Sequence, residues 1–306
     1  MKRGGDREVV FKYHGLGNDF VLLDRRRSAA DIDSSTARQL CDRRRGIGAD
    51  GVLVLLPSDS AAARMVVHNA DGSTAEMCGN GLRCAAKYLV DGSSEKPKSL
   101  RLETAAGLLS CELFYRDGAV DEVQVSMGPA RLVADNLPSR FSGQPFINQE
   151  LSGFSGLKGT AISMGNPHLI LFEAPLTDAV RLGPQLEHSD AFPGRTNVGF
   201  GELRDGGIQL RVWERGAGLT QACGTGACAA VAAAVAEHRL RAGAWIPVTV
   251  PGGVLQVRCE PDFSNVEMRG PAAFVFEASV PVSPDGGEPF DLPTADSSAI
   301  RTPGSS

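Results

Sequence analysis

The 306-residue sequence has no long apolar run and no excess of positive charge. Its longest run of small apolar residues, 227–236, falls far short of the roughly 20 residues that span a bilayer. With 31 basic and 36 acidic side chains the formal charge is −5, which gives no general attraction to nucleic acid or anionic lipid. The first residues also lack the apolar segment of a secretory signal. We therefore expect a soluble cytoplasmic protein with neither a membrane nor a nucleic-acid partner.

Cysteine is sparse, and the motifs of several common enzyme classes are missing. Seven cysteines are too few and too scattered for the disulfide framework of a secreted protein, so free thiols are expected. No H-E-x-x-H metal motif occurs, and neither a P-loop nor a G-x-S-x-G serine motif is present. The segment Gly15-x-Gly17-x-x-Phe20 lacks the third glycine of a dinucleotide-binding loop. We therefore expect no metal site and no nucleotide cofactor.

Glycine, in contrast, is abundant, with 36 residues, and several of them lie in two related segments. Residues 65–90 read MVVHNADGSTAEMCGNGLRCAAKYLV, and residues 210–235 read LRVWERGAGLTQACGTGACAAVAAAV. The offset of 145 residues between Cys78 and Cys223 holds along both segments. Further echoes in the same order pair residues 17–18 with 165–166, and residues 125–129 with 266–271. Four ordered echoes at nearly one offset indicate two homologous halves.

The repeats also indicate the domain boundaries. We expect an N-terminal half at 8–130 and a C-terminal half at 131–271, which begins with a linker rich in proline, serine and glycine. Residues 272–281 alternate like one more strand and are expected to complete the first half. From Pro281 onward, five prolines occur among 26 mostly polar residues, so 282–306 is predicted to be a disordered tail.

Most of the remaining pattern predicts strands, with one central helix in each half. A helix should follow Cys78 and stop at Asp91-Gly92, and another should follow Cys223 and remain apolar on every face until Glu237. Short strands rich in β-formers are expected at 21–24, 52–56, 100–104, 108–114, 122–126, 208–213 and 254–259. The predicted fold class is α/β (α+β), with two pseudo-symmetric domains, each a curled, mostly antiparallel sheet around a central helix.

The two Cys-Gly-x-Gly segments carry the chemistry. A cysteine at a helix N-terminus faces the positive end of the helix dipole, which lowers the thiol pKa from about 8.5 and favours the thiolate. The adjacent glycine N–H groups can bind an anion such as a carboxylate. If Cys78 and Cys223 face each other, one thiolate can remove the α-proton of an amino acid while the opposite thiol protonates the other face. This pattern favours inversion of a carbon acid.

The alternative for any single cysteine is a small buried residue, and we interpret the other five in that way. These are Cys41, Cys84, Cys111, Cys228 and Cys259. A disulfide between Cys78 and Cys223 would be an oxidised, inactive form.

The sequence resembles the diaminopimelate epimerase family, which interconverts LL- and meso-diaminopimelate. The matching segments are HGLGNDFVLLD (14–24), RRGIGADG (44–51), NADGSTAEMCGNGLRC (69–84), MGNPH (164–168), TNVGF (196–200) and ERGAGLTQACGTGACAA (214–230). The resemblance implies two pseudo-symmetric α/β domains, no metal and no pyridoxal phosphate. It implies a cytoplasmic homodimer that supplies lysine and peptidoglycan precursors, with Cys78 and Cys223 as the acid/base pair.

The resemblance also assigns the other site residues. His168 and Glu214 would tune the two thiols, and Arg215 offers a planar fork for the distal carboxylate. The remaining substrate-binding residues that it implies are Asn18, Asn69, Gly79, Asn80, Asn166, Asn197, Gly224 and Thr225, together with Glu214. Two departures stand out: Gly51 replaces a glutamine found in some members, and Leu219 replaces an acidic residue or proline.

Some polar residues are left out of this site, and two rival functions remain. Asp19 and Asp71 are interpreted as turn or cap residues, and the arginine runs 25–27 and 43–45 as solvated faces. One rival is a proline racemase or hydroxyproline epimerase, although these carry His after the first Cys-Gly, where this chain has Asn80. The other is a non-catalytic thiol protein that binds metal or senses oxidants, which would have no use for Arg215.

Overall fold

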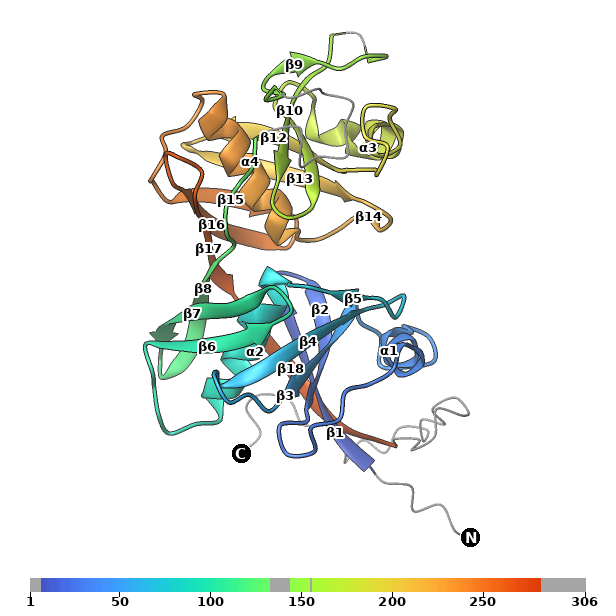
Figure 1. Ribbon diagram of the computed structural model, residues 1–306, viewed down its shortest axis with the longest axis vertical. Coiled ribbons are helices and arrows are strands. Elements are labelled where there is room, and N and C mark those ends of the chain that lie inside the picture. The colour runs from blue at the N-terminus through green and yellow to red at the C-terminus, as the bar shows by residue number, and fades with distance from the viewer. Residues whose placement is uncertain (1–6, 133–143, 155, 282–306) are drawn as a thin grey trace. The chain divides into compact units, whose positions relative to one another are not determined.

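The computed structural model describes residues 7–132, 144–154 and 156–281 (Figure 1). The chain divides into two compact units, Met1–Val123 with Pro271–Ser306, and Gln124–Gly270. We call these the N-terminal and C-terminal units. The division after Val123 comes before the residue 130 boundary expected from the repeats, because the end of strand β8 pairs with β17 of the C-terminal unit. The predicted tail, 282–306, lies outside the described residues.

The N-terminal unit is a mostly antiparallel sheet with a helix packed against it. Its elements are β1 (Arg7–Gly15), β2 (Asn18–Asp24), α1 (Ser34–Cys41), β3 (Gly51–Leu56), β4 (Ala63–Asn69), β5 (Thr74–Ala75), α2 (Gly79–Asp91), β6 (Ser99–Thr104), β7 (Gly107–Arg116), β8 (Ala119–Ser126) and β18 (Ala273–Pro281). Among the pairings of its described strands, β2–β3 and β4–β6 are parallel, whereas β1–β2, β1–β18, β3–β4 and β6–β7 are antiparallel. Strand β18 returns to pair antiparallel with β1, which is why residues from Pro271 onward belong to this unit.

The C-terminal unit repeats this order. Its elements are β9 (Gln149–Glu150), β10 (Lys158–Ser163), β11 (Pro167–Leu171), the 3-10 helix η2 (Leu176–Asp178), α3 (Ala179–Glu187), β12 (Asn197–Arg204), β13 (Gly207–Glu214), β14 (Gly218–Leu219), α4 (Gly224–Ala236), β15 (Ile246–Val250), β16 (Gly253–Cys259) and β17 (Val266–Pro271). The parallel pairs β11–β12 and β13–β15 stand where the first unit has β2–β3 and β4–β6. The predicted pseudo-symmetric fold is confirmed.

The central helix of each unit packs against many of that unit's strands. Helix α4 contacts β10, β11, β12, β13 and β16, and α2 contacts β1, β2, β3, β4, β6, β7 and β18. Alanine dominates α4, and every residue from Gly226 to Val235 is buried. Because alanine side chains are small, the strands can approach this helix closely on all sides. In the C-terminal unit, the alanine content of the helix therefore explains how strands from several parts of the sheet pack against it.

Helix α2 differs from α4 because it buries two cations. The Arg83 side chain is fully buried, and its Nε donates to the Pro271 carbonyl at 3.2 Å. Lys87 Nζ donates to the Val120 carbonyl at 2.5 Å and pairs with Asp91 at 2.7 Å. These bonds offset the desolvation of the charges and also tie α2 to the two chain segments that close the unit.

Candidate active site

Cys78 and Cys223 occupy the same structural position in the two units. Each is the N-cap of its central helix, with an extended backbone at φ −140° and φ −116°. Cys78 Sγ accepts from the Gly81 N–H at 3.4 Å, and Cys223 Sγ accepts from the Gly226 N–H at 3.4 Å. The thiols thus satisfy an N–H group that helix geometry leaves without an intrahelical partner.

The last glycine of each Cys-Gly-x-Gly segment, Gly81 or Gly226, lies too close to its neighbours to carry a side chain without a shift. A Cβ added to Gly81 would lie 2.9 Å from Leu53 Cδ2. One added to Gly226 would lie 2.9 Å from Val212 Cγ2 and 3.2 Å from Cys223 Sγ. A Cβ at either position would therefore require the sheet side chain or the helix terminus to shift, and at Gly226 it would also crowd the Cys223 thiol.

The surroundings of Cys223 favour the protonated thiol. Burial raises the pKa of Cys223 well above its ordinary value, and the charge of Glu214 raises it further. The Thr225 hydroxyl and the Gly226 N–H act in the opposite direction but do not compensate. The expectation that the helix dipole favours a thiolate is therefore wrong for Cys223, because burial is the larger effect.

Glu214 lies at the end of β13 and is the repeat counterpart of Asn69 at the end of β4. Its side chain hydrogen-bonds to Cys223, and Oε1 also accepts from Thr220 Oγ1 at 2.5 Å. Asn69 Nδ2 instead donates to Ser73 Oγ at 2.9 Å. At this position of the repeat, the C-terminal unit therefore has an ionisable carboxylate beside its thiol, whereas the N-terminal unit has a neutral amide that bonds to a serine.

His168 connects to Cys223 through two other predicted site residues. His168 Nε2 lies 3.0 Å from Asn166 Oδ1, Asn166 Nδ2 donates to Thr225 Oγ1 at 3.4 Å, and Thr225 Oγ1 lies 3.6 Å from Cys223 Sγ. Burial, and then the charge of Arg215, lowers the pKa of His168 to about 3. His168 is therefore neutral near pH 7 and donates from Nε2 to the Asn166 oxygen.

Asn197 and Arg215 form a second group in the C-terminal unit. Asn197 Oδ1 accepts from the Arg215 backbone N–H at 2.9 Å, and its Nδ2 donates to the Pro167 carbonyl at 2.8 Å. Arg215 is exposed, and its Nη1 donates to the Gly194 carbonyl at 3.1 Å. In this arrangement Asn197 uses its amide to hold the backbone that carries Arg215.

The sequence interpretation missed Glu187, which accepts hydrogen bonds from the residues that flank Glu214 and Arg215. Its carboxylate is buried at the end of α3 and accepts from Trp213 Nε1 at 2.8 Å and from the Gly216 N–H at 3.0 Å. Glu187 therefore holds the residues on both sides of Glu214-Arg215. A lone glutamate near the end of a short helix offers no sequence pattern that would reveal this contact.

In the N-terminal unit the predicted site residues Asn18 and Asn80 are joined directly. Asn80 Nδ2 donates to Asn18 Oδ1 at 2.9 Å, and Asn80 follows Gly79 in the first turn of α2. Asn69 donates to Ser73 instead of to either of these asparagines.

The arginine runs are only partly solvated faces. Arg25 pairs with Glu8 at 2.8 Å, and Arg26 pairs with Asp24 at 2.7 Å. Arg43 pairs with Asp19 at 2.6 Å and with Asp50 at 2.8 Å. The interpretation of the runs as solvated faces is corrected only for Arg25, which is half-buried against Glu8; the other five arginines are exposed.

All seven cysteines are free thiols, and the five assigned to packing are buried. Within the residues that the structure describes, no group of three or more His, Cys, Asp or Glu side chains could hold a metal ion. No helix in the same residues is long and apolar enough to cross a membrane.

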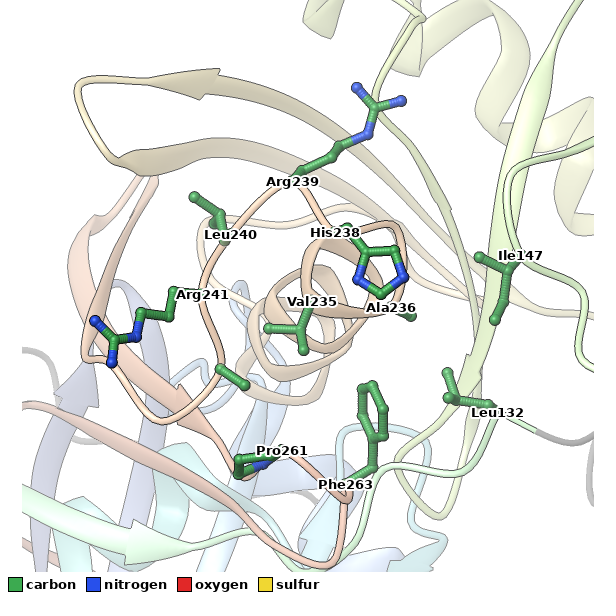
Figure 2. A pocket seen from close by; sticks show the side chains of 11 residues that line it. Leu132, Ile147, Val235, Ala236, His238, Arg239, Leu240, Arg241, Pro261 and Phe263 are labelled. Atoms are coloured by element: carbon green, nitrogen blue, oxygen red, sulfur yellow. The ribbon is translucent and has the colours of Figure 1, made fainter.

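A hollow in the C-terminal unit lies away from these residues. It has a volume of about 630 Å³ and is lined at the C-terminal end of α4, the end opposite Cys223 (Figure 2). Val235 and His238 line it together with Phe263 and Leu132. None of the predicted site residues contributes to it, so this hollow is not the candidate active site.

Comparison with known proteins gives close relatives along nearly the whole chain. A family model described as "Diaminopimelate epimerase" matches residues 10–133 and 160–275. A diaminopimelate epimerase of Moorella thermoacetica is 42% identical over 89% of this chain and 98% of its own length. The corresponding protein of Desulforudis audaxviator is 46% identical over 87% of this chain and 96% of its own length.

A solved structure confirms the architecture. A hydroxyproline epimerase of Agrobacterium vitis, with bound trans-4-hydroxy-L-proline, superposes with a TM-score of 0.66 over 94% of this chain and 95% of that chain. At 19% identity this likeness concerns the fold alone. The fold is therefore shared with a hydroxyproline epimerase, which is one of the rival functions. The relatives that are similar in sequence are instead named diaminopimelate epimerase.

Proposed function

Since this chain is an enzyme that belongs to the diaminopimelate epimerase family, we propose that it converts LL-2,6-diaminopimelate to the meso isomer without a cofactor. The observation that supports the mechanism most is the equivalence of Cys78 and Cys223. Cys78 caps α2 and Cys223 caps α4, and these two helices occupy the same place in the two repeats. An inversion needs a base on one face of a carbon and an acid on the other. A duplicated unit supplies one thiol for each.

The proton steps balance without an added reactant. One thiolate takes the α-proton, and the electron pair of the broken C–H bond moves toward the substrate carboxylate. The opposite thiol then donates its proton to the other face of the carbon and becomes a thiolate. The backbone N–H groups at Gly79 and Gly224 bind the carboxylate as its negative charge grows.

The electrostatics of Cys223 suggest which thiol begins as the acid. Burial and the charge of Glu214 raise the pKa of Cys223, which supports a role for Cys223 as the proton donor in the resting enzyme. His168 and Glu214 are proposed to tune the thiols. After one turnover the two cysteines have exchanged protonation states.

The other site residues are proposed to recognise the second amino acid group of the substrate. Arg215 binds the distal carboxylate through its planar guanidinium. Polar contacts are assigned to Asn18, Asn69, Asn80, Asn166, Asn197, Glu214 and Thr225. We further propose that the enzyme acts in the cytoplasm as a homodimer and serves lysine and peptidoglycan precursor synthesis.

Deuterium exchange tests the proposed function. Reduced wild-type protein in D₂O, with no added cofactor, should exchange the α-hydrogen of LL-diaminopimelate and form the meso isomer. Cys78→Ala and Cys223→Ala should each abolish inversion, while Cys111→Ala, which changes a buried thiol outside the helix termini, should retain it. If either single variant at the helix termini inverted the substrate at near the wild-type rate, the two-base assignment would be wrong.

Assays with alternative substrates separate this proposal from the proline racemase or hydroxyproline epimerase function, which the same fold supports. L-proline and trans-4-hydroxy-L-proline offer one carboxylate only and give Arg215 nothing to bind. We expect no inversion of either compound under conditions that convert diaminopimelate. Conversion of proline with no activity on diaminopimelate would reverse the assignment.

A further inference from the structure

The N-terminal unit contains a charged network that reaches the proposed site through one amide. Asn18 Nδ2 donates to Asp50 Oδ2 at 2.8 Å, and the backbone N–H of Asp19 donates to the same oxygen at 3.1 Å. Arg43 Nη2 donates to the other Asp50 oxygen at 2.8 Å and to Asp19 Oδ1 at 2.6 Å. Lys12 Nζ also pairs with Asp19, at Oδ2, at 2.6 Å.

This network determines which way the Asn18 amide points. An ionised carboxylate can only accept hydrogen bonds, so the group that faces Asp50 must be the NH₂ of Asn18. The Asn18 oxygen is then turned toward α2, where it accepts from Asn80 Nδ2 at 2.9 Å. Asn80 is buried two residues after Cys78, so the order set at Asp50 reaches the helix terminus.

The repeat shows the opposite arrangement in the C-terminal unit. Asn166 is the counterpart of Asn18, and Thr225 is the counterpart of Asn80. Asn166 accepts at Oδ1 from neutral His168 and donates from Nδ2 to Thr225 Oγ1 at 3.4 Å. The asparagine oxygen faces the helix terminus in the first unit, and the asparagine nitrogen faces it in the second.

We propose that Asp50, held by Arg43, is a positioning residue that fixes the amide polarity of Asn18 and so makes the two related halves of the site chemically unequal. This inference rests on the proposed function, because Asn18 and Asn80 are assigned there to the substrate. If the two asparagine amides had the same orientation, equivalent places in the two units would offer a substrate the same hydrogen-bonding group. The opposed amides give one half an oxygen and the other half a nitrogen at equivalent places.

A double-mutant cycle tests whether Asp50 acts through Asn18. Asp50→Ala should lower kcat/KM by about 10- to 100-fold, as the loss of a supporting residue typically does. In an Asn18→Ala background the same change should have less than a twofold further effect, because the amide it orients is gone. Asp50→Leu keeps the approximate size of the side chain, removes both acceptor oxygens, and serves with the same expected loss if the alanine variant does not fold. The exposed Asp59→Ala, in the same unit, should match the wild type.

The asparagine side-chain amides provide a readout that needs no turnover. In protein labelled with ¹⁵N-asparagine, the NH₂ signals of Asn18, identified by their loss in Asn18→Ala, should shift in Asp50→Ala and stay in place in Asp59→Ala. Additive losses in the cycle, or unchanged Asn18 signals, would overturn the proposal. A wild-type enzyme inactive on diaminopimelate would refute the proposed function instead, while the amide signals would still decide whether Asp50 orients Asn18.

Discussion

At the scale of single residues, the site depends on side chains that hold others in place. Glu187 and Asp50 belong to different units, yet each is an acid that accepts from the segment bearing a proposed substrate contact. A carboxylate is suited to this task because it can accept several N–H groups and cannot donate. Neither residue lies in a motif that points to catalysis.

Replacing Glu187 with glutamine should loosen the turn that carries Glu214 and Arg215. The amide keeps one acceptor but places an NH₂ against either Trp213 Nε1 or the Gly216 N–H. Leaving one buried donor unmatched costs about 1–3 kcal/mol of unfolding free energy. Urea denaturation measures this loss, and KM for diaminopimelate should rise because Arg215 loses its support.

The matched control for this prediction is Glu112→Gln on an exposed position of β7. It should leave both the unfolding free energy and KM at their wild-type values. A Glu187→Gln variant that resembled this control would show that the turn is held by its other contacts.

Gly226 makes a sharper prediction about the reacting thiol. Alanine at this position places its Cβ 2.9 Å from Val212 Cγ2 and 3.2 Å from Cys223 Sγ, so the helix terminus must shift. Overpacking of this kind destabilises proteins by about 1–3 kcal/mol. We expect that loss in urea denaturation and at least a tenfold fall in kcat, about 1.4 kcal/mol in barrier height.

Gly92→Ala provides the comparison, since nothing lies within 4 Å of a Cβ there and the backbone is right-handed. It should fold and react like the wild type. Equal stability and activity of the two alanine variants would mean that the space between Gly226, Val212 and Cys223 can hold a methyl group.

At the scale of elements, the central helices follow from their small residues. Inserting leucine for Ala230, which is fully buried in α4, forces the surrounding strands apart. The expected cost is about 1–3 kcal/mol or more in unfolding free energy. Ala236→Leu at the half-buried end of the same helix should be less damaging, and a cost equal to that of Ala230→Leu would contradict the tight packing of the helix centre.

The sequence predicted these two helices and the strands that it named, each of which falls on an observed strand, because the patterns that define them are local. Cys-Gly-x-Gly marks each helix start, and the glycine after Asp91 or the polar Glu237 marks the end. Short β-branched runs between turn residues predicted strands such as β3 and β16.

The helices that the sequence interpretation missed have weak or contradictory local patterns. Helix α3 contains Gly183 and Pro184, which normally argue against a helix. Gly183 is nevertheless required there, because a Cβ would lie 2.6 Å from the Trp213 ring. Helix α1 could have been found, since Asp33 Oδ1 accepts from the Thr36 N–H at 2.7 Å as a standard N-cap.

The site itself divides in the same way. The cysteines and asparagines lie in motifs that can be read locally, but the links from Asp50 to Asn18, from Arg43 to Asp19 and from Glu187 to Trp213 join residues distant in sequence. Only the folded sheet brings those side chains together. The pKa of Cys223 could not be predicted from its helix position either, because burial depends on the packing around α4.

At the scale of the whole molecule, buried thiols and paired acids should bound the pH range of stability. Burial raises the pKa of Cys111 and of Cys84 to about 12, and that of Cys41 to about 11. In the unfolded chain these thiols ionise near pH 8.5. Above that pH the unfolded state releases protons that the folded state retains, so stability falls as pH rises.

The acidic limit has the opposite sign. Burial alone would raise the pKa of Asp19, but hydrogen bonds from Arg43 and Lys12 outweigh it and hold the pKa at about 2. The carboxylate therefore contributes stability above its unfolded pKa of about 3.9, and this contribution is lost as pH falls toward 2.

We therefore expect the unfolding free energy to be nearly flat only between about pH 7 and 8 and to decline on both sides, the acidic decline beginning near pH 6.5, where His168 of the unfolded chain takes up a proton that the buried ring does not. Urea denaturation at half-unit intervals from pH 3 to 10 measures the curve. Cys111→Ala should lessen the alkaline decline by up to about 1.4 kcal/mol per pH unit, and Asp19→Asn should lessen the acidic decline while leaving the alkaline side unchanged. An alkaline slope identical in wild type and Cys111→Ala would mean that this thiol ionises equally in both states, and that burial in the sheet does not hold its proton.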